Sequence, residues 1–287
     1  MKLYTINKYQ TVNEAPFGAG GLDVNIFKRE LRANFISLLI WSGILILFSI
    51  MGIGEFSAYY ENPDIIEVFE NFPPAFLEAA NINTLNITTI IGFFGVMFGY
   101  YALIVSVFAI MLGADIISKE ERDKTAEFAL VYPITRAKIV TGKIFAAIVN
   151  CIVINLVTWA GVLLLSARFE PDQKFFEFLQ LSIIAFFMLE IIFLALGILL
   201  GCALKHYKRA NSLAVSIVLG TYILSILSGL SDKLEFLKYF TPFNYFSPLE
   251  MSNNMAFDTV FLWLSAVITI VAIGLAYLAY AKRDINI

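Results

Sequence analysis

The chain alternates between long apolar stretches and shorter polar segments. An α-helix rises about 1.5 Å per residue, so ~20 apolar residues are enough to cross the ~30 Å hydrocarbon core of a membrane. Six stretches are long enough, and all but one of them lack Asp, Glu, Lys and Arg. The pattern therefore predicts six spans, at residues 33–54, 90–113, 144–167, 178–203, 211–230 and 259–281.

These stretches predict an all-α fold. Backbone N–H and C=O groups in lipid must bond to one another, so the structures that span a membrane are helices and closed barrels. Barrel strands need only ~10 residues of alternating polarity, whereas these stretches are longer and continuously apolar. Of the 287 residues, 59% are hydrophobic and 15% are charged, which is more apolar side chain than a soluble fold can bury. We expect a polytopic membrane protein with lipid as its solvent.

The distribution of Lys and Arg predicts the orientation. Most of them lie in segments 1–32, 114–143, 204–210 and after residue 281. The exceptions, in the segments between, are Arg168, Lys174, Lys233 and Lys238. Because basic loops stay on the cytoplasmic side, both termini are predicted to be cytoplasmic. The net charge of −3 gives no reason to expect a nucleic-acid partner.

Polar segments flank and connect the spans. Residues 1–21 contain Pro16 and several glycines, which predicts a cytoplasmic tail, and residues 282–287 form a second tail. Residues 22–32 combine apolar and basic side chains, which predicts an interfacial amphipathic helix on the cytoplasmic leaflet. Residues 33–281 then form one transmembrane domain. Its last outer loop, 231–258, is rich in aromatic residues that suit a membrane interface, and its prolines predict short helices.

Residues 115–143 form the longest cytoplasmic connection. From Ile116 to about Tyr132 the segment has good helix formers and no Gly or Pro, and Pro133 then ends the run. A helix here has a partly apolar side and many charged residues. It could lie along the membrane surface and offer its charged side chains to another protein.

The same loop resembles that of the ABC-2 type permeases. The resemblance lies in two acidic residues followed by Thr, Glu, an apolar pair, Pro, a hydroxyl residue, Arg and a downstream Lys, here Glu120, Glu121, Thr125, Glu127, Leu130, Pro133, Thr135, Arg136 and Lys143. It extends to the layout of the whole chain. One position departs from it, because Lys124 stands where the family commonly has Gly.

The resemblance implies that 115–143 contains a cytoplasmic coupling helix that fits into a cleft of an ATPase subunit. The implied coupling residues are Glu120, Glu121, Arg122, Thr125, Glu127, Pro133 and Arg136. It further implies export, driven by two ABC ATPase subunits. A second copy of this permease, or a related permease, would complete the pathway, in the plasma membrane of a prokaryotic cell.

The chain itself lacks a recognisable nucleotide site. A phosphate-binding loop needs G-x-x-x-x-G-K-[ST] between a strand and a helix, and Gly142-Lys143 has neither the earlier glycine nor the strand. We therefore expect no cofactor, catalytic residue or metal site in this chain, and ATP and Mg²⁺ on the partner ATPase. The transported substrate stays open among a peptide, a lipid, an antibiotic and an ion.

Polar residues inside the spans are candidates for a transport pathway. Glu190 is the ionisable residue deep within a predicted span, which predicts either a substrate-facing group or a hydrogen-bonded link between helices. Asn155 and Thr158 share a helix face and could bond to a neighbouring helix or line the path. Gly197 and Gly201 form a small-xxx-small pair, which predicts close packing of two helices.

Two other functions match the sequence less well. A self-contained ion-coupled secondary transporter usually has several intramembrane ionisable groups, and this chain has Glu190 and little else. A membrane-embedded enzyme would need clustered His, Asp or Cys, and the chain has one His. The scarcity of intramembrane ionisable groups and the single His therefore favour a permease subunit over both alternatives.

Overall fold

The structure, a computed structural model, describes residues 19–60, 62, 85–122, 135–204, 206–230 and 232–282. The side chains of residues 19–25, 120–122, 232 and 235 are outside this description. Its six long helices are α1 (Ala19–Tyr59), α4 (Ile90–Arg122), α6 (Arg136–Ser166), α7 (Gln173–Ala203), α8 (Tyr207–Gly229) and α10 (Thr259–Lys282). Each is long and apolar enough to span a membrane. The described residues contain helices and no strands, so the all-α prediction is confirmed.

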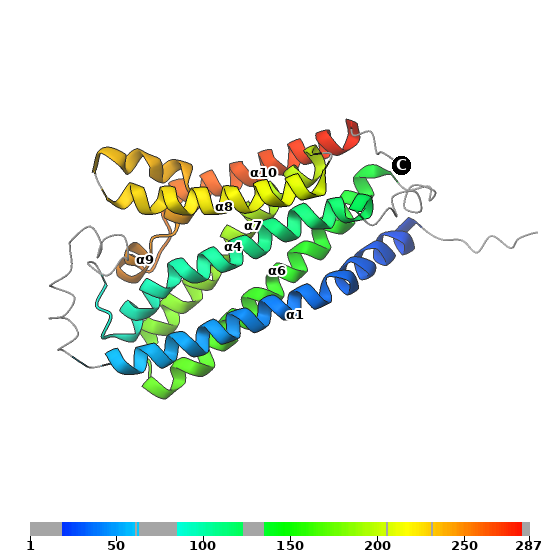
Figure 1. Ribbon diagram of the computed structural model, residues 1–287. Helices are drawn as coiled ribbons and strands as arrows, with labels where there is room; N and C mark the ends of the chain where they lie inside the picture. Colours follow the sequence, from blue (N-terminus) through cyan, green and yellow to red (C-terminus); the bar gives the residue numbers. More distant parts are fainter. Residues whose placement is uncertain are drawn as a thin grey trace, which may run out of the picture.

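The six long helices run alongside one another and alternate in direction (Figure 1). We call the end of the bundle where α1 begins and α10 ends the proximal end, at the right of Figure 1. The opposite end is the distal end. The chain leaves α4 and enters α6 at the proximal end, so residues 123–134 connect the helices there.

Several helices extend beyond the predicted spans at the proximal end. Residues 22–32 are helical, but as the first turns of α1 rather than as a separate interfacial helix. Similarly, α4 continues to Arg122, and α6 already begins at Arg136. Most of the predicted spans end beside a charged residue, whereas a helix continues past a charge whenever that side chain reaches water or a partner. The predicted coupling helix is therefore, up to Arg122, a continuation of α4.

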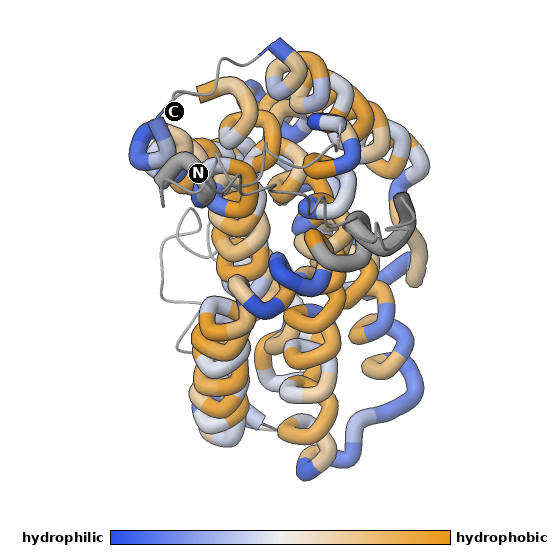
Figure 2. Tube along the Cα trace, turned by 90° about the vertical axis from the view of Figure 1, so that its right-hand side faces the viewer, coloured by the Kyte–Doolittle hydropathy of each residue, from blue (hydrophilic) through white to orange (hydrophobic). Residues whose placement is uncertain are grey.

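Helices α4 and α7 form the centre of the bundle. In an 18-residue apolar stretch of each of these helices, 56% of the residues are buried, compared with 11% in α1 and in α8. The outer helices expose apolar side chains such as Ile36 and Leu47 on α1. Figure 2, which looks at the bundle from the proximal end, shows that hydrophobic residues dominate the helices along their lengths. Such exposed apolar faces suit contact with lipid or with another membrane helix.

Short helical segments cover part of the distal end. They are η1 (Ala167–Phe169), η2 (Asp232–Phe240), η3 (Pro242–Tyr245) and α9 (Pro248–Asn254). Pro242 and Pro248 each lie in the first turn of a segment, where the missing N–H costs no hydrogen bond. The prediction that these prolines divide 231–258 into short helices is therefore confirmed.

Candidate functional site

A buried cluster of charges joins three helices at the proximal end. Glu30 of α1 is fully buried and lies between Lys119 of α4 and Lys143 of α6. The Glu30 carboxylate forms an ion pair with the Lys119 ammonium, and the Lys143 Nζ lies 3.4 Å from Glu30 Oε1. Because ammonium and carboxylate groups are strongly stabilised by opposite charges in a dry environment, this pairing makes their burial tolerable.

Lys143 also bonds to the backbone of α4. Its ammonium donates to the Ile116 carbonyl at 2.6 Å, and 1% of the residue is exposed. Both lysines belong to the predicted coupling loop 115–143, one near its start and one at its end. Glu30 therefore holds the two ends of that loop against the beginning of α1.

A second set of contacts ties the start of α6 to the end of α10. The Arg136 guanidinium donates to the carbonyls of Tyr280 and Ala281, each at 3.3 Å. One turn further on, the Thr141 hydroxyl lies 2.6 Å from the Tyr277 hydroxyl. Arg136 thus lies at the proximal end with partners on α10, and its coupling role stays a prediction.

The start of α6 is well defined locally. Thr135 is the N-cap residue, with extended backbone angles, and its hydroxyl accepts from the Lys138 N–H at 3.4 Å. Such a cap satisfies one of the N–H groups left unbonded in a first helical turn. The chain therefore enters α6 in a fixed direction, with Arg136 immediately inside the helix.

Most of the predicted coupling residues fall outside the structural description. Thr125, Glu127 and Pro133 lie in 123–134, which the structure does not describe. The backbone of 120–122 is helical as the last turn of α4, but the side chains of Glu120, Glu121 and Arg122 are not described. Their coupling role therefore stays a prediction.

Glycines allow α4 and α7 to touch backbone to backbone. A Cβ atom on Gly197 would lie 2.3 Å from the Ile110 carbonyl oxygen, and one on Gly201 would lie 2.9 Å from that of Ala114. On α4, Gly113 is equally crowded, since its Cβ would lie 2.5 Å from the Leu194 carbonyl oxygen. The predicted close packing at Gly197 and Gly201 is confirmed. The contact holds α4, the helix that precedes residues 123–134, directly against α7.

The three predicted pathway residues lie inside the bundle. Asn155 of α6 donates a hydrogen bond to Glu190 of α7, which is fully buried. The Thr158 hydroxyl instead donates to the Ile154 carbonyl of its own helix at 2.9 Å. The structure therefore contains the predicted link between helices through Glu190 and Asn155, and Thr158 is not part of it.

One oxygen of each partner in this link has no hydrogen bond. Glu190 Oε1 and Asn155 Oδ1 are buried without a hydrogen-bond partner among the described residues. Burying a polar atom without a hydrogen bond costs free energy. These two oxygens can therefore accept a hydrogen bond from a donor outside the described residues. A role in lining a pathway stays a prediction alongside the structural one.

Sequence reasoning missed Glu30. It lies beside Lys28, Arg29 and Arg32, and this basic surrounding suggested contact with lipid headgroups instead of burial. The available signal was one acidic residue within a basic segment, together with two lysines at the ends of a distant loop. Their pairing depends on the packing of α1 against α4 and α6, which the local pattern does not encode.

Comparison with known proteins covers nearly the whole chain. The model of a family described as ABC-2 family transporter protein matches residues 24–285. No curated protein matches the chain significantly. The match includes the six long helices apart from the first residues of α1, together with the buried charge cluster and the segment between α4 and α6. The chain therefore belongs to the ABC-2 family of transporter proteins, as a membrane-spanning permease of the kind that works with ABC ATPases.

Proposed function

We propose that the chain is the permease subunit of an ATP-driven exporter, coupled to separate ATPase subunits through residues 115–143. Membership in the ABC-2 family supports the transport role. The observation that carries the coupling proposal is the attachment of both ends of this segment to other helices. Lys119 and Lys143 bind Glu30 of α1, and Arg136 binds the end of α10.

This attachment explains how a movement of the segment would reach the transport pathway. An ATPase subunit that binds residues 123–134 would move α4 and α6 directly. Through Glu30 and Arg136 the same movement would reach α1 and α10. A ligand or nucleotide shifts a conformational equilibrium only if it favours one state, so the ATPase must bind the segment more tightly in one arrangement of the bundle.

The proposal includes a complete assembly. Two copies of the chain, or one copy and a related permease, pair with two ABC ATPase subunits that bind ATP and Mg²⁺. The proximal end then faces the cytoplasm, in agreement with its basic residues, and both termini lie on that side of a prokaryotic plasma membrane. The path would form between the paired bundles by alternating access.

Charge reversal tests the coupling. The variants Glu121→Lys and Arg136→Glu are purified with the ATPase subunits, and ATP hydrolysis is measured in proteoliposomes. Each variant should lower the stimulation of hydrolysis that the permease causes, because one changes the predicted docking charges and the other detaches α6 from α10. Helical content, measured by circular dichroism, should stay at the parent level.

Lys138→Glu is the matched control, since Lys138 is an exposed residue on the same turn of α6. It should leave stimulation unchanged. Full stimulation in both Glu121→Lys and Arg136→Glu would contradict the proposal. Failure of the chain to co-purify with any ATPase from its source cells would contradict it more broadly.

Orientation is tested separately. The two native cysteines, Cys151 and Cys202, are buried, so they should react poorly with a membrane-impermeant maleimide. A cysteine introduced at Lys138 should be labelled only after cells are permeabilised, and one introduced at Lys233 should be labelled in intact cells. The opposite pattern would overturn the assigned orientation.

A further inference from the structure

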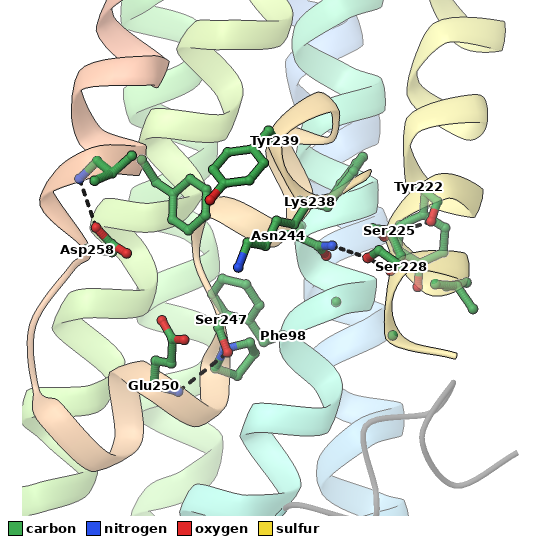
Figure 3. A pocket seen from close by; sticks show the side chains of 18 residues that line it. Phe98, Tyr222, Ser225, Ser228, Lys238, Tyr239, Asn244, Ser247, Glu250 and Asp258 are labelled. Atoms are coloured by element: carbon green, nitrogen blue, oxygen red, sulfur yellow. Dashed lines mark hydrogen bonds between the residues drawn. The ribbon is translucent and has the colours of Figure 1, made fainter. Parts of the chain in front are cut away.

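A cavity of about 510 Å³ lies at the distal end, between α4, α8 and the segments that cover them. This volume lies within the ~300–1,000 Å³ range of small-molecule sites. Figure 3 shows side chains from these elements converging on it. The residues used below are Phe98 of α4, Ile226 of α8, Lys238 of η2, Phe243 of η3, Glu250 of α9, and Asp258 just before α10.

Among the described residues that line it, the cavity combines one cation with two carboxylates. Lys238, Glu250 and Asp258 come from three different segments and all line it. The Lys238 ammonium lies 5.4 Å from the centre of the Tyr239 ring. The structure records no ion pair for Glu250 with any described residue, and Asp258 accepts the Val260 N–H at 2.8 Å. A ligand that carries both an ammonium and an anionic group matches this arrangement.

Part of the remaining lining is apolar, and part is already hydrogen-bonded. Phe98 and Phe243 are largely buried rings, and Ile226 adds an aliphatic side chain. Asn244 of η3 donates to the Ser228 hydroxyl of α8, a bond drawn in Figure 3. This bond fixes the cover against α8, so the cavity is shaped before a ligand arrives.

The position of the cavity points to a lipid. It lies at the distal ends of membrane-spanning helices, where a leaflet places its headgroups. Around it, η2 exposes the aromatic rings of Phe236, Tyr239 and Phe240, and such rings favour the interface between hydrocarbon and water. We call Phe98, Phe243 and Ile226 the apolar wall of the cavity. Within one turn of Ile226 on α8, Ile223 and Leu227 expose apolar side chains that suit contact with lipid chains. The volume has room for a headgroup and glycerol backbone, but not for two full acyl chains.

We propose that the distal cavity binds the headgroup of a zwitterionic phospholipid from the leaflet at that end. The Lys238 ammonium binds the phosphate, and the Glu250 and Asp258 carboxylates bind the headgroup amine. The acyl chains leave the cavity along the apolar wall and stay in the bilayer. This site is a property of the single chain, so it does not depend on coupling to an ATPase.

Binding is tested on the purified full-length chain in detergent micelles, without ATPase subunits. Native mass spectrometry measures the retained lipid during titration with phosphatidylethanolamine, phosphatidylglycerol or diacylglycerol. Phosphatidylethanolamine should bind about tenfold more tightly than the other two, because only it fills both charged halves of the site and each charge-assisted bond contributes more than a neutral one. Equal retention of all three would overturn the proposal.

Variants assign the two halves of the site. Lys238→Met should reduce phosphatidylethanolamine binding about tenfold, and the double variant Glu250→Gln with Asp258→Asn should remove the preference over phosphatidylglycerol. Lys233→Met and Glu177→Gln are matched controls, because these residues are exposed at the distal end but outside the cavity. Melting curves of all variants show that each remains folded.

A soluble headgroup distinguishes a lipid from a free zwitterion. Glycerophosphoethanolamine, which has no acyl chains, should compete with the lipid only weakly, because the apolar wall then stays unfilled. Competition as strong as that of the lipid would overturn the lipid assignment. Parent-like binding by Lys238→Met and by the double variant would place the lipid elsewhere and would also overturn it. Loss of ATPase stimulation with lipid binding intact would count only against the coupling proposal.

Discussion

The two ends of the bundle are built differently. At the proximal end, α1, α4 and α6 are joined by buried charges, and nearby α4 and α7 touch through glycines. At the distal end, short helical segments contact one another and the long helices through single hydrogen bonds and ring contacts, around a cavity. The proximal end is suited to passing on a movement as one body, whereas the distal end is suited to holding a ligand.

The two ends differ in how much stability the protein loses when one contact is removed. Removing one member of a buried charge cluster leaves the others buried without compensation, which is expensive. Removing one hydrogen bond between neutral groups costs less, because no buried charge loses its partner. Four substitutions, from the proximal end to the distal end, should therefore have progressively smaller effects on stability.

Glu30→Gln should have the largest effect. It removes the carboxylate and leaves the Lys119 and Lys143 ammonium groups close together and largely buried, so we expect a loss of about 3–5 kcal/mol. Unfolding by SDS titration in mixed micelles measures it. Arg29→Gln is the control, since 55% of the Arg29 side chain is exposed and its pair with Glu30 should contribute ~1 kcal/mol or less. Equal stability of the two variants would remove the basis for a rigid proximal end.

Gly197→Ala should come next. Its new Cβ would meet the Ile110 carbonyl, part of the backbone of α4, so the two helices must separate. Overpacking of this kind costs roughly 1–3 kcal/mol. The same titration applies, with Gly220→Ala as the control, because a Cβ on Gly220 of α8 meets nothing within 4 Å. An unchanged Gly197→Ala protein would show that α4 and α7 are less tightly packed than described.

Asn155→Leu probes the middle of the bundle. It removes the hydrogen bond to Glu190, and such bonds between membrane helices contribute about 0.6–2 kcal/mol. A double-mutant cycle with Glu190→Leu isolates the pair. A coupling energy near zero would leave Glu190 without its structural role and would strengthen the pathway interpretation.

Tyr245→Phe should have the smallest effect. The Tyr245 hydroxyl donates to the Tyr239 carbonyl at 2.7 Å, and its loss should cost roughly 0.5–1.5 kcal/mol at neutral pH. Burial raises the pKa of Tyr245 to about 12, above the ~10 of an exposed tyrosine. Between these values the unfolded chain loses a proton that the folded chain keeps, so stability falls as the pH rises from 10 to 12.

The variant should therefore lose less stability than the parent over that pH range. Unfolding titrations at pH 9, 10, 11 and 12 test this difference. Parallel pH dependence in the two proteins would mean that Tyr245 is not the titrating group, and a loss at neutral pH as large as that of Glu30→Gln would contradict the contrast between the ends.

Much of the fold was predictable because lipid imposes strict rules. Six apolar stretches specified six spanning helices, and Pro242 and Pro248 specified breaks between short segments. Helix ends were less predictable. The predicted spans begin after Arg32 and after Lys143, whereas α1 already contains Glu30 and α6 already contains Lys143, because each of these charges has a partner inside the bundle.

The candidate site was predictable only in part. The local motif located the segment between α4 and α6, together with Arg136 near the proximal end. It did not indicate Glu30, whose sequence neighbours are basic, nor Gly113, whose crowding depends on where α7 lies.

The sequence by itself determined the solvent, the class, the number of spans and the position of the segment that joins α4 to α6, because each follows from hydrophobicity or from a local motif. Only the tertiary structure decided that Glu30 holds Lys119 and Lys143, that Asn155 meets Glu190, and that a charged cavity lies at the distal end. These contacts join residues far apart in the chain, so they depend on how the helices pack against one another. Local periodicity leaves that packing undetermined.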